Sequence, residues 1–197
     1  MNKSIFRPYN SIAEASDIIN KKNISDVSVD KFNICYIPEN TPFNDLLWCR
    51  LAVPIHNMEG NTIAWAGRRL DSLEEIIDKS YGSKYLDADL KEAKVKKWNK
   101  SKWVNSSYDK RKNLFNIHRA YKSIISNNYV FLTEGYFDVI SFDQKGIHNT
   151  LATCGTSLSH TQSMMIRSLC DTCVIVFDPD KAGIEASLKA SETLNAV

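Results

Sequence analysis

The chain has 197 residues, 43% of them hydrophobic and 24% charged, which is the balance of a globular protein large enough to bury a core. It has no apolar run near the roughly 20 residues that a membrane helix needs, and its first residues lack the apolar stretch of a secretory signal. Five cysteines without framework spacing indicate reduced thiols, so the composition excludes a membrane-spanning or disulfide-stapled protein and predicts a cytoplasmic one.

The first part of the chain predicts short helices and a β-hairpin. Apolar spacing predicts helices over 11–20, near 25–31 and over 113–126, and residues 71–100 have a polar, helical pattern. Two β-rich runs, "RLAVPIHN" and "NTIAWAGRRL", flank Asn57-Met58-Glu59-Gly60, which is a hairpin signal. Pro54 predicts that the first of these runs is an edge strand or contains a bulge.

From residue 129 onward, strands and helices alternate strictly. The strands are "YVFLTEG", "NTLATCG" and "CVIVFD", and the helices are "YFDVISFDQKG", closed by Gly146, "SHTQSMMIRSLC", opened by Ser159, and "KAGIEASLKASETLNA". This order predicts a parallel sheet with helices on its faces. The expected fold class is therefore α/β, with an α+β N-terminal subdomain over 1–127 and the parallel-sheet domain over 128–197.

Acidic residues follow the first and third of these strands. Glu134 closes the first strand, and Asp178 and Asp180 close the third. Ligands collect at the carboxyl ends of parallel strands, and residues two apart in extended backbone point to the same side. Asp138 lies one helical turn after Glu134. Such a cluster favours a hard cation, and Mg²⁺ prefers oxygen ligands of this kind.

Two alternatives stay open at this stage. Asp180 is also in the right place to cap the last helix, with Asp178 as a solvated neighbour. Cys170-x-x-Cys173 has the spacing of half a zinc site, but a structural zinc site needs four ligands and no second pair exists. Two small thiols in the core are the favoured interpretation, and no zinc is expected in this chain.

The positive charge is concentrated in one block. Residues 79–122 carry 13 basic and 4 acidic side chains, and aromatic residues are interleaved among them. Lysine and arginine neutralise phosphates, and aromatic rings stack on unpaired bases. With Arg68 and Arg69 just upstream, the block predicts a phosphate-binding surface. For residues 88–98 alone, a solvated helix is the better explanation.

Several motifs together resemble a known family. "EGYFD" (134–138), "LATCGTSLS" (151–159) and "FDPDKAG" (177–183) are similar to the Toprim domain of bacterial-type DNA primases. Upstream, "DKFNICYIP", "CRLAVPIHNMEGNTIAWAGRRL", "SKWVNS" and "LFNIHRA" follow the order of the RNA-polymerase core of those primases. The resemblance implies an enzyme that synthesises short RNA primers on single-stranded DNA from nucleoside triphosphates, using two or more Mg²⁺ or Mn²⁺ ions.

The resemblance also implies roles for particular residues. Glu134, Asp178 and Asp180 would be catalytic metal ligands, with Asp138 beside them. The residues implied in nucleotide or nucleic-acid binding are Arg68, Arg69, Lys102, Asn105, Lys110, Arg111, Lys112, Gly155, Thr156 and Lys181. Lys181 is expected to pair with the acidic residues rather than with a phosphate.

The sequence also departs from the family pattern. Pro179 replaces the usual small residue between the two aspartates, and the Toprim domain is expected to be incomplete at its C-terminal end. A replicative helicase or a zinc-binding template-recognition domain would act in trans, and a phage or other mobile element is the expected source. The alternative functions are a Toprim nuclease and a non-catalytic, single-stranded-DNA-binding replication accessory protein.

Overall fold

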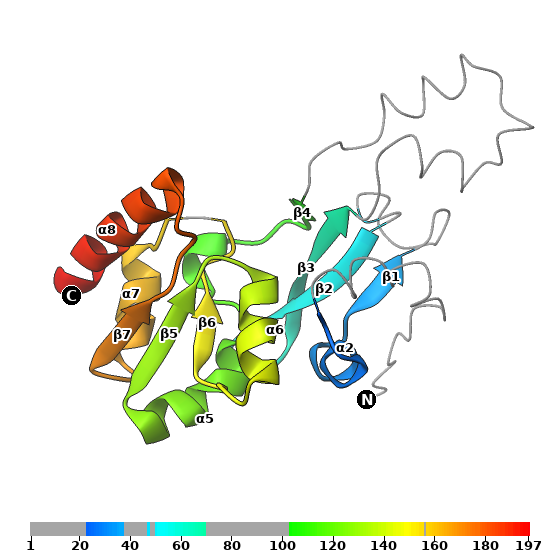
Figure 1. The fold of residues 1–197 in the computed structure, drawn as a ribbon, viewed down its shortest axis with the longest axis horizontal. Helices are drawn as coiled ribbons and strands as arrows, with labels where there is room; N and C mark the ends of the chain where they lie inside the picture. Colours follow the sequence, from blue (N-terminus) through cyan, green and yellow to red (C-terminus); the bar gives the residue numbers. More distant parts are fainter. Residues whose placement is uncertain (1–22, 38–46, 48–49, 70–102, 156) are drawn as a thin grey trace, which may run out of the picture. The chain divides into compact units, whose positions relative to one another are not determined.

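The computed structural model describes residues 23–37, 47, 50–69, 103–155 and 157–197 (Figure 1). The expected helices over 11–20 and 71–100, and also Lys102 and Thr156, lie outside the described residues. The elements in chain order are α2 (Asp26–Phe32), β1 (Cys35–Ile37), β2 (Arg50–His56), β3 (Thr62–Arg69), β4 (Trp103–Asn105), the 3₁₀ turn η2 (Lys110–Lys112), α5 (Ile117–Asn127), β5 (Tyr129–Thr133), α6 (Tyr136–Gln144), β6 (Thr150–Ala152), α7 (His160–Arg167), β7 (Thr172–Ile175) and α8 (Lys181–Asn195). None of these helices is both long and apolar enough to cross a bilayer.

The described residues divide into two compact units. The first unit contains residues 29–37, 47, 50–54, 65–69 and 103–106, and the second contains residues 23–28, 55–64, 107–155 and 157–197. The expected domain boundary after residue 127 stays a prediction. In the second unit, α5 packs into the same core as the strands that follow it.

An antiparallel sheet with strand order β1-β2-β3-β4 forms the first sheet. The predicted hairpin is confirmed, because β2 and β3 are neighbours and Gly60, at φ +83°, closes the turn between them. The expectation that Pro54 marks an edge strand is wrong, since β2 lies between β1 and β3. Proline is tolerated there because the β1 pairing ends at Ala52, two residues earlier.

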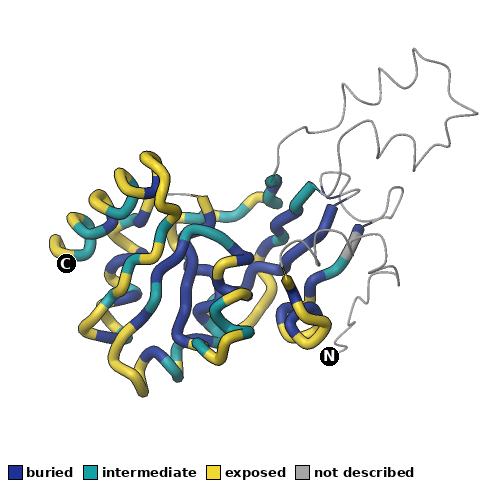
Figure 2. Tube along the Cα trace, in the orientation of Figure 1, coloured by how far each residue is buried: buried dark blue, intermediate teal, exposed yellow. Residues whose placement is uncertain are grey.

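The second sheet is parallel, with the order β6-β5-β7, as the alternating pattern predicted. Val130 and Leu132 of β5 face α5, α7 and α8, and they form one core with Leu151 of β6 and Ile166 of α7. On the opposite face, Phe131 contacts Phe142 of α6, with ring centroids 5.4 Å apart. Central β5 and short β6 are well covered, whereas β7 alternates between exposed and partly buried residues (Figure 2).

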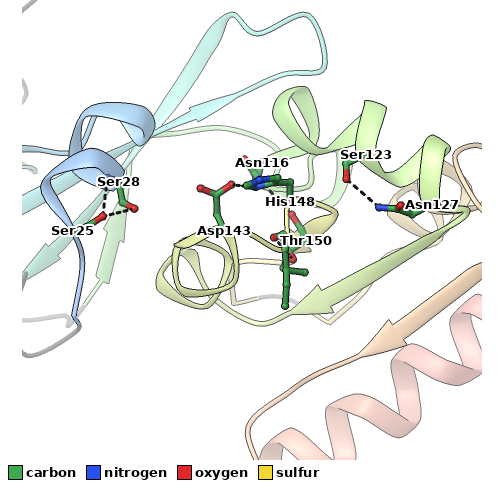
Figure 3. Close-up of polar contacts among 9 residues, drawn as sticks. Ser25, Ser28, Asn116, Ser123, Asn127, Asp143, His148 and Thr150 are labelled. Atoms are coloured by element: carbon green, nitrogen blue, oxygen red, sulfur yellow. Dashed lines mark hydrogen bonds and ion pairs between the residues drawn. The ribbon is translucent and has the colours of Figure 1, made fainter. Parts of the chain in front are cut away.

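The helix ends in this unit follow the capping signals of the sequence. Ser159 caps α7 and forms a capping box, and Gly146, at φ +80°, donates to the Asp143 carbonyl just after α6. Polar contacts join neighbouring elements in Figure 3, where the Asn116 amide donates to the Thr150 carbonyl at 3.1 Å. The same view shows His148, whose Nδ1 lies 2.7 Å from an oxygen of Asp143.

Two histidines of the second unit stack on one another. The rings of His56, at the end of β2, and His118, in α5, have centroids 4.3 Å apart. Burial, and then the positive charge of Arg119, lowers the pKa of each imidazole to about 4. Both side chains are therefore neutral at pH 7.

This pair predicts that the protein loses stability in mild acid. The unfolded chain binds protons at these histidines below about pH 6.5, whereas the folded chain binds them only near pH 4, so the free energy of unfolding falls as the pH falls between those values. The two shifts at face value would give about 4 kcal/mol between pH 7 and pH 5. Because partial exposure to solvent reduces such effects, we expect a loss of about 2 kcal/mol, measured by urea unfolding. His118→Gln should reduce this loss, and His160→Gln, on the exposed start of α7, is the control. An unchanged pH dependence in His118→Gln would contradict the prediction.

Candidate functional site

The acidic residues predicted at the ends of β5 and β7 lie together. Glu134 directly follows β5, and the loop containing Asp178 and Asp180 follows β7, which pairs with β5. A Glu134 carboxylate oxygen accepts a hydrogen bond from the backbone N–H of Asp178 at 3.2 Å. Neighbouring parallel strands therefore place one carboxylate against the loop that holds the other two.

Two of the four carboxylates also cap helices. Asp138, in the first turn of α6, accepts from the backbone N–H of Gly135 at 2.9 Å. Asp180 is the N-cap of α8 and accepts from the backbone N–H of Gly183 at 2.8 Å, so the capping alternative is confirmed. We call Glu134, Asp138, Asp178 and Asp180 the acidic edge.

The electrostatics of Glu134 reflect this crowding. Its pKa is raised, chiefly because burial penalises the charged carboxylate, and further because the other three carboxylates are close. The hydrogen bond from the Asp178 N–H acts in the opposite direction, since it stabilises the charged form. Repulsion among neighbouring carboxylates is the condition under which a bound cation is favourable.

The donor set of the acidic edge fits a hard cation. Every donor is a carboxylate, and an ionised carboxylate has two oxygens that accept several interactions, so the capping bond of Asp180 leaves capacity for another ligand. As they stand, the residues described by the structure include no group of three or more His, Cys, Asp or Glu side chains that could hold a metal ion. The four side chains thus have suitable chemistry and proximity without forming a complete cage.

The sequence suggested that Asp178 and Asp180 lie in an extended strand, but the structure places both beyond the end of β7. β7 ends at Ile175, and a bend begins at Pro179. The Val176 N–H still donates to the Leu132 carbonyl at 2.8 Å, which continues the pairing by one residue. Beyond that point the chain turns so that Asp180 can begin α8.

Gly183 is a site residue that the sequence interpretation missed. A Cβ at this position would overlap the carbonyl oxygen of Asp178 and come within 3.1 Å of its backbone nitrogen. The backbone of α8 and that of the aspartate loop therefore touch directly, which only glycine permits. The signal was present in "FDPDKAG", where glycine stands three residues after Asp180.

A sharp corner after β6 adjoins the acidic edge. Cys154 and Gly155 both have positive φ, +58° and +87°, and Thr156 lies outside the described residues. The Cys154 N–H donates to the backbone carbonyl of Glu134 at 2.9 Å. Hydrogen bonding with the Tyr136 side chain also engages the buried Cys154 thiol, whose pKa is raised by burial. The corner is thus fixed to Glu134 through backbone and to α6 through side chains.

Three cations in a row form a second feature of this unit. Lys110, Arg111 and Lys112 make up η2, which we call the basic turn, and none of the three is buried. Asp109 caps the turn by accepting from the Arg111 N–H at 3.1 Å. The charge of Lys110 acts on the Cys154 thiol, as does that of Asp138. The basic turn and the acidic edge therefore both lie near enough to the corner after β6 for their charges to act on the Cys154 thiol.

The remaining predicted binding residues lie elsewhere in the chain. In the first unit, Arg68 is opposite Trp103, with its guanidinium 5.5 Å from the ring centroid, and Ala66 is opposite Asn105. Because alternate residues share a face, Arg68 and Asn105 lie on the same side of this sheet and Arg69 lies on the other. Lys181, exposed at the start of α8, directly follows Asp180.

The cysteine pair of the second unit belongs to its core. Cys170 is buried and Cys173 packs against the same cluster, and both are free thiols. Burial raises the pKa of the Cys173 thiol to about 12. The interpretation as two core thiols is confirmed.

Comparison with known proteins shows what this chain and its fold are similar to. Residues 131–197 match the Toprim-like family. The chain is 33% identical over 156 residues to a DNA primase of Enterococcus faecalis, an alignment that covers 79% of this chain and 22% of that protein. The chain therefore spans about a fifth of the length of this curated relative.

Solved structures show the same fold. The crystal structure of the zinc-binding and RNA polymerase domains of Aquifex aeolicus primase superimposes with a TM-score of 0.72 at 24% identity, covering 92% of this chain and 46% of that one. A DnaG primase catalytic domain bound to single-stranded DNA superimposes with a TM-score of 0.67 at 21% identity, covering 91% and 58%. The family match and the fold define a Toprim-containing protein. More particularly, the chain is a relative of the bacterial-type DNA primases.

Proposed function

We propose that the chain is the catalytic core of a DNA primase, which synthesises short RNA primers on single-stranded DNA during replication. The observation that carries the proposal is the meeting of Glu134 with the loop that holds Asp178 and Asp180, and it is supported by the charge of the basic turn, which acts on the adjoining corner after β6. Carboxylates suit metal ions and cations suit phosphates, so the second unit contains both kinds of group that nucleotidyl transfer requires. The relationship to primases supports the assignment of this chemistry to primer synthesis.

In this mechanism, Glu134, Asp178 and Asp180 would hold Mg²⁺ or Mn²⁺, with Asp138 beside them. The ions, two or more in number, would neutralise phosphate charge and lower the pKa of the attacking hydroxyl. The 3′-oxygen of the primer bonds to the α-phosphorus of the next nucleotide, the bond from that phosphorus to the β-phosphate oxygen breaks, and pyrophosphate leaves. The basic turn, Gly155 and Thr156 bind phosphates, while Arg68, Arg69, Lys102 and Asn105 bind the template or nucleotide. Lys181 pairs with the acidic edge.

The proposed partners follow from this activity. They are the single-stranded template, nucleoside triphosphates and, in trans, a replicative helicase or a zinc-binding template-recognition domain. The proposed place of action is the cytoplasm, where bacteria and infecting phages replicate DNA.

Labelled-nucleotide incorporation on single-stranded DNA, with Mg²⁺ or Mn²⁺ present, tests the proposal. We expect products a few nucleotides long, absent when the metal is chelated. Nicking of DNA without synthesis would instead support the Toprim nuclease alternative. DNA binding without either reaction would support the accessory-protein alternative.

Replacement of the basic turn should weaken DNA binding in a salt-dependent way. We expect Lys110–Lys112 changed to three alanines to bind a single-stranded oligonucleotide more weakly. We also expect the slope of log affinity against log salt to become shallower by about 2, because each phosphate contact on single strands contributes roughly 0.7. Fluorescence anisotropy at several salt concentrations measures both quantities. The matched control replaces Lys122, Lys145 and Lys189, three exposed lysines, and removes the same charge elsewhere. Equal effects of the two triple variants would refute a specific role for the turn.

A further inference from the structure

The side chain of Gln162 connects α7 to the basic turn. It is fully buried, with 0% of its surface exposed, in the first turn of α7. Its amide nitrogen donates to two backbone carbonyls, that of Lys110 at 2.9 Å and that of Asn113 at 2.8 Å. Its amide oxygen accepts from the backbone N–H of Ser159 at 2.9 Å. Both amide N–H donors and the amide oxygen are thus engaged.

Ser159 adds a second connection from the same helix end. Its hydroxyl donates to the Arg111 carbonyl at 2.6 Å and accepts from the backbone N–H of Gln162 at 3.1 Å. A capping box needs only an acceptor at the position of Gln162, which glutamate would supply equally well. The two bonds to the carbonyls of Lys110 and Asn113 need a donor, so they go beyond what capping α7 requires.

These bonds and the cap from Asp109 together hold the backbone of the basic turn. No residue of η2 is buried, and three neighbouring cations repel one another, so the side chains themselves do not anchor the turn. Its backbone carbonyls are bound by Gln162 and Ser159, which leaves the charged side chains available at the surface. The ion pair between Lys112 and Asp109, at 3.5 Å and well exposed, is too weak to replace this anchor.

We propose that Gln162 is a positioning residue, whose side-chain amide holds the basic turn beside the corner after β6 so that its cations meet phosphate. The inference rests on the proposed phosphate-binding function of the turn. Gln162 contacts neither substrate nor metal in this proposal, and acts only through the backbone of the turn.

Two replacements of Gln162 distinguish the loss of its donated hydrogen bonds from changes in the charge or volume of the side chain. Gln162→Glu keeps the capping acceptor and removes both donors, whereas Gln162→Met keeps the approximate length without charge. We expect each to weaken binding of a single-stranded oligonucleotide about tenfold, since two partly buried hydrogen bonds to the backbone of the turn segment are lost. The control is Ser163→Ala, which removes a partly buried hydrogen bond from α7 to the Thr193 carbonyl, at 3.2 Å, without touching the turn. It should lower the melting temperature and leave the affinity of the folded protein unchanged.

Combination with the triple alanine variant of Lys110–Lys112 decides whether Gln162 acts through the turn. Residues in one network give non-additive effects, so Gln162→Met should add no further loss of binding in that background. Additive losses, a loss in Gln162→Glu alone, or an equal loss in Ser163→Ala would each overturn the positioning role. If the triple variant itself binds normally, the proposed function of the turn fails instead, which separates the two failures.

Discussion

Replacing Glu134 with glutamine should lower nucleotide incorporation by at least about 100-fold, because a neutral amide would not neutralise the metal ion that the acidic edge is proposed to hold. Glu134 lies where the β5 end, the corner after β6 and the aspartate loop meet. Glutamine keeps the shape and one accepting oxygen, so the bond from the Asp178 N–H can persist. The expected result is therefore a loss of activity with little change in folding.

The measurement is incorporation of labelled nucleotide on single-stranded DNA, with the melting temperature recorded for each protein. Glu192→Gln makes the same chemical change at an exposed position on α8 and is the matched control. Removal of a crowded carboxylate should leave the melting temperature of Glu134→Gln equal to that of the parent or slightly higher. Incorporation at the parent level by a folded Glu134→Gln protein would contradict the proposed metal site.

Local patterns were sufficient to predict the second sheet and its helix ends. The alternation from residue 129 onward fixed three parallel strands, and Ser159, Gly146 and Asp180 each behave as their residue types predict. The same reasoning put Glu134 near the two aspartates, because the ends of adjacent parallel strands meet. Short-range preferences and one topological rule were therefore enough to predict the second sheet and the position of Glu134 beside the aspartate loop.

Long-range contacts account for what the sequence did not reveal. Nothing in the neighbourhood of Gln162 indicates that its amide binds carbonyls 49 and 52 residues away. The sequence also did not reveal that Pro54 lies in a central strand, since this is tolerated because of where β1 stops pairing rather than because of β2 itself. Such features depend on which segments meet in space, and a single sequence does not encode that in local spacing.

Replacement of Gly183 with alanine should displace the loop that holds Asp178 and so disrupt the acidic edge. A Cβ there would overlap the Asp178 carbonyl oxygen, and backbone, unlike a flexible side chain, cannot move aside cheaply. We expect a loss of about 3 kcal/mol in the free energy of unfolding. We also expect about a 100-fold loss of incorporation by the folded fraction, because misplacement of a catalytic group by about 1 Å has effects of that size.

Gly146→Ala is the control that separates the loss of stability from the loss of incorporation. Its Cβ would meet nothing within 4 Å, but φ is +80°, so the substitution costs about 1 kcal/mol of backbone strain at a position away from the acidic edge. Urea unfolding and incorporation, measured on both variants, should show a stability loss in each and an activity loss only in Gly183→Ala. If activity falls in proportion to stability in both, glycine at 183 serves folding alone and the aspartate loop tolerates displacement. If Gly183→Ala is folded and active, the direct contact between α8 and the loop is not what positions the aspartates.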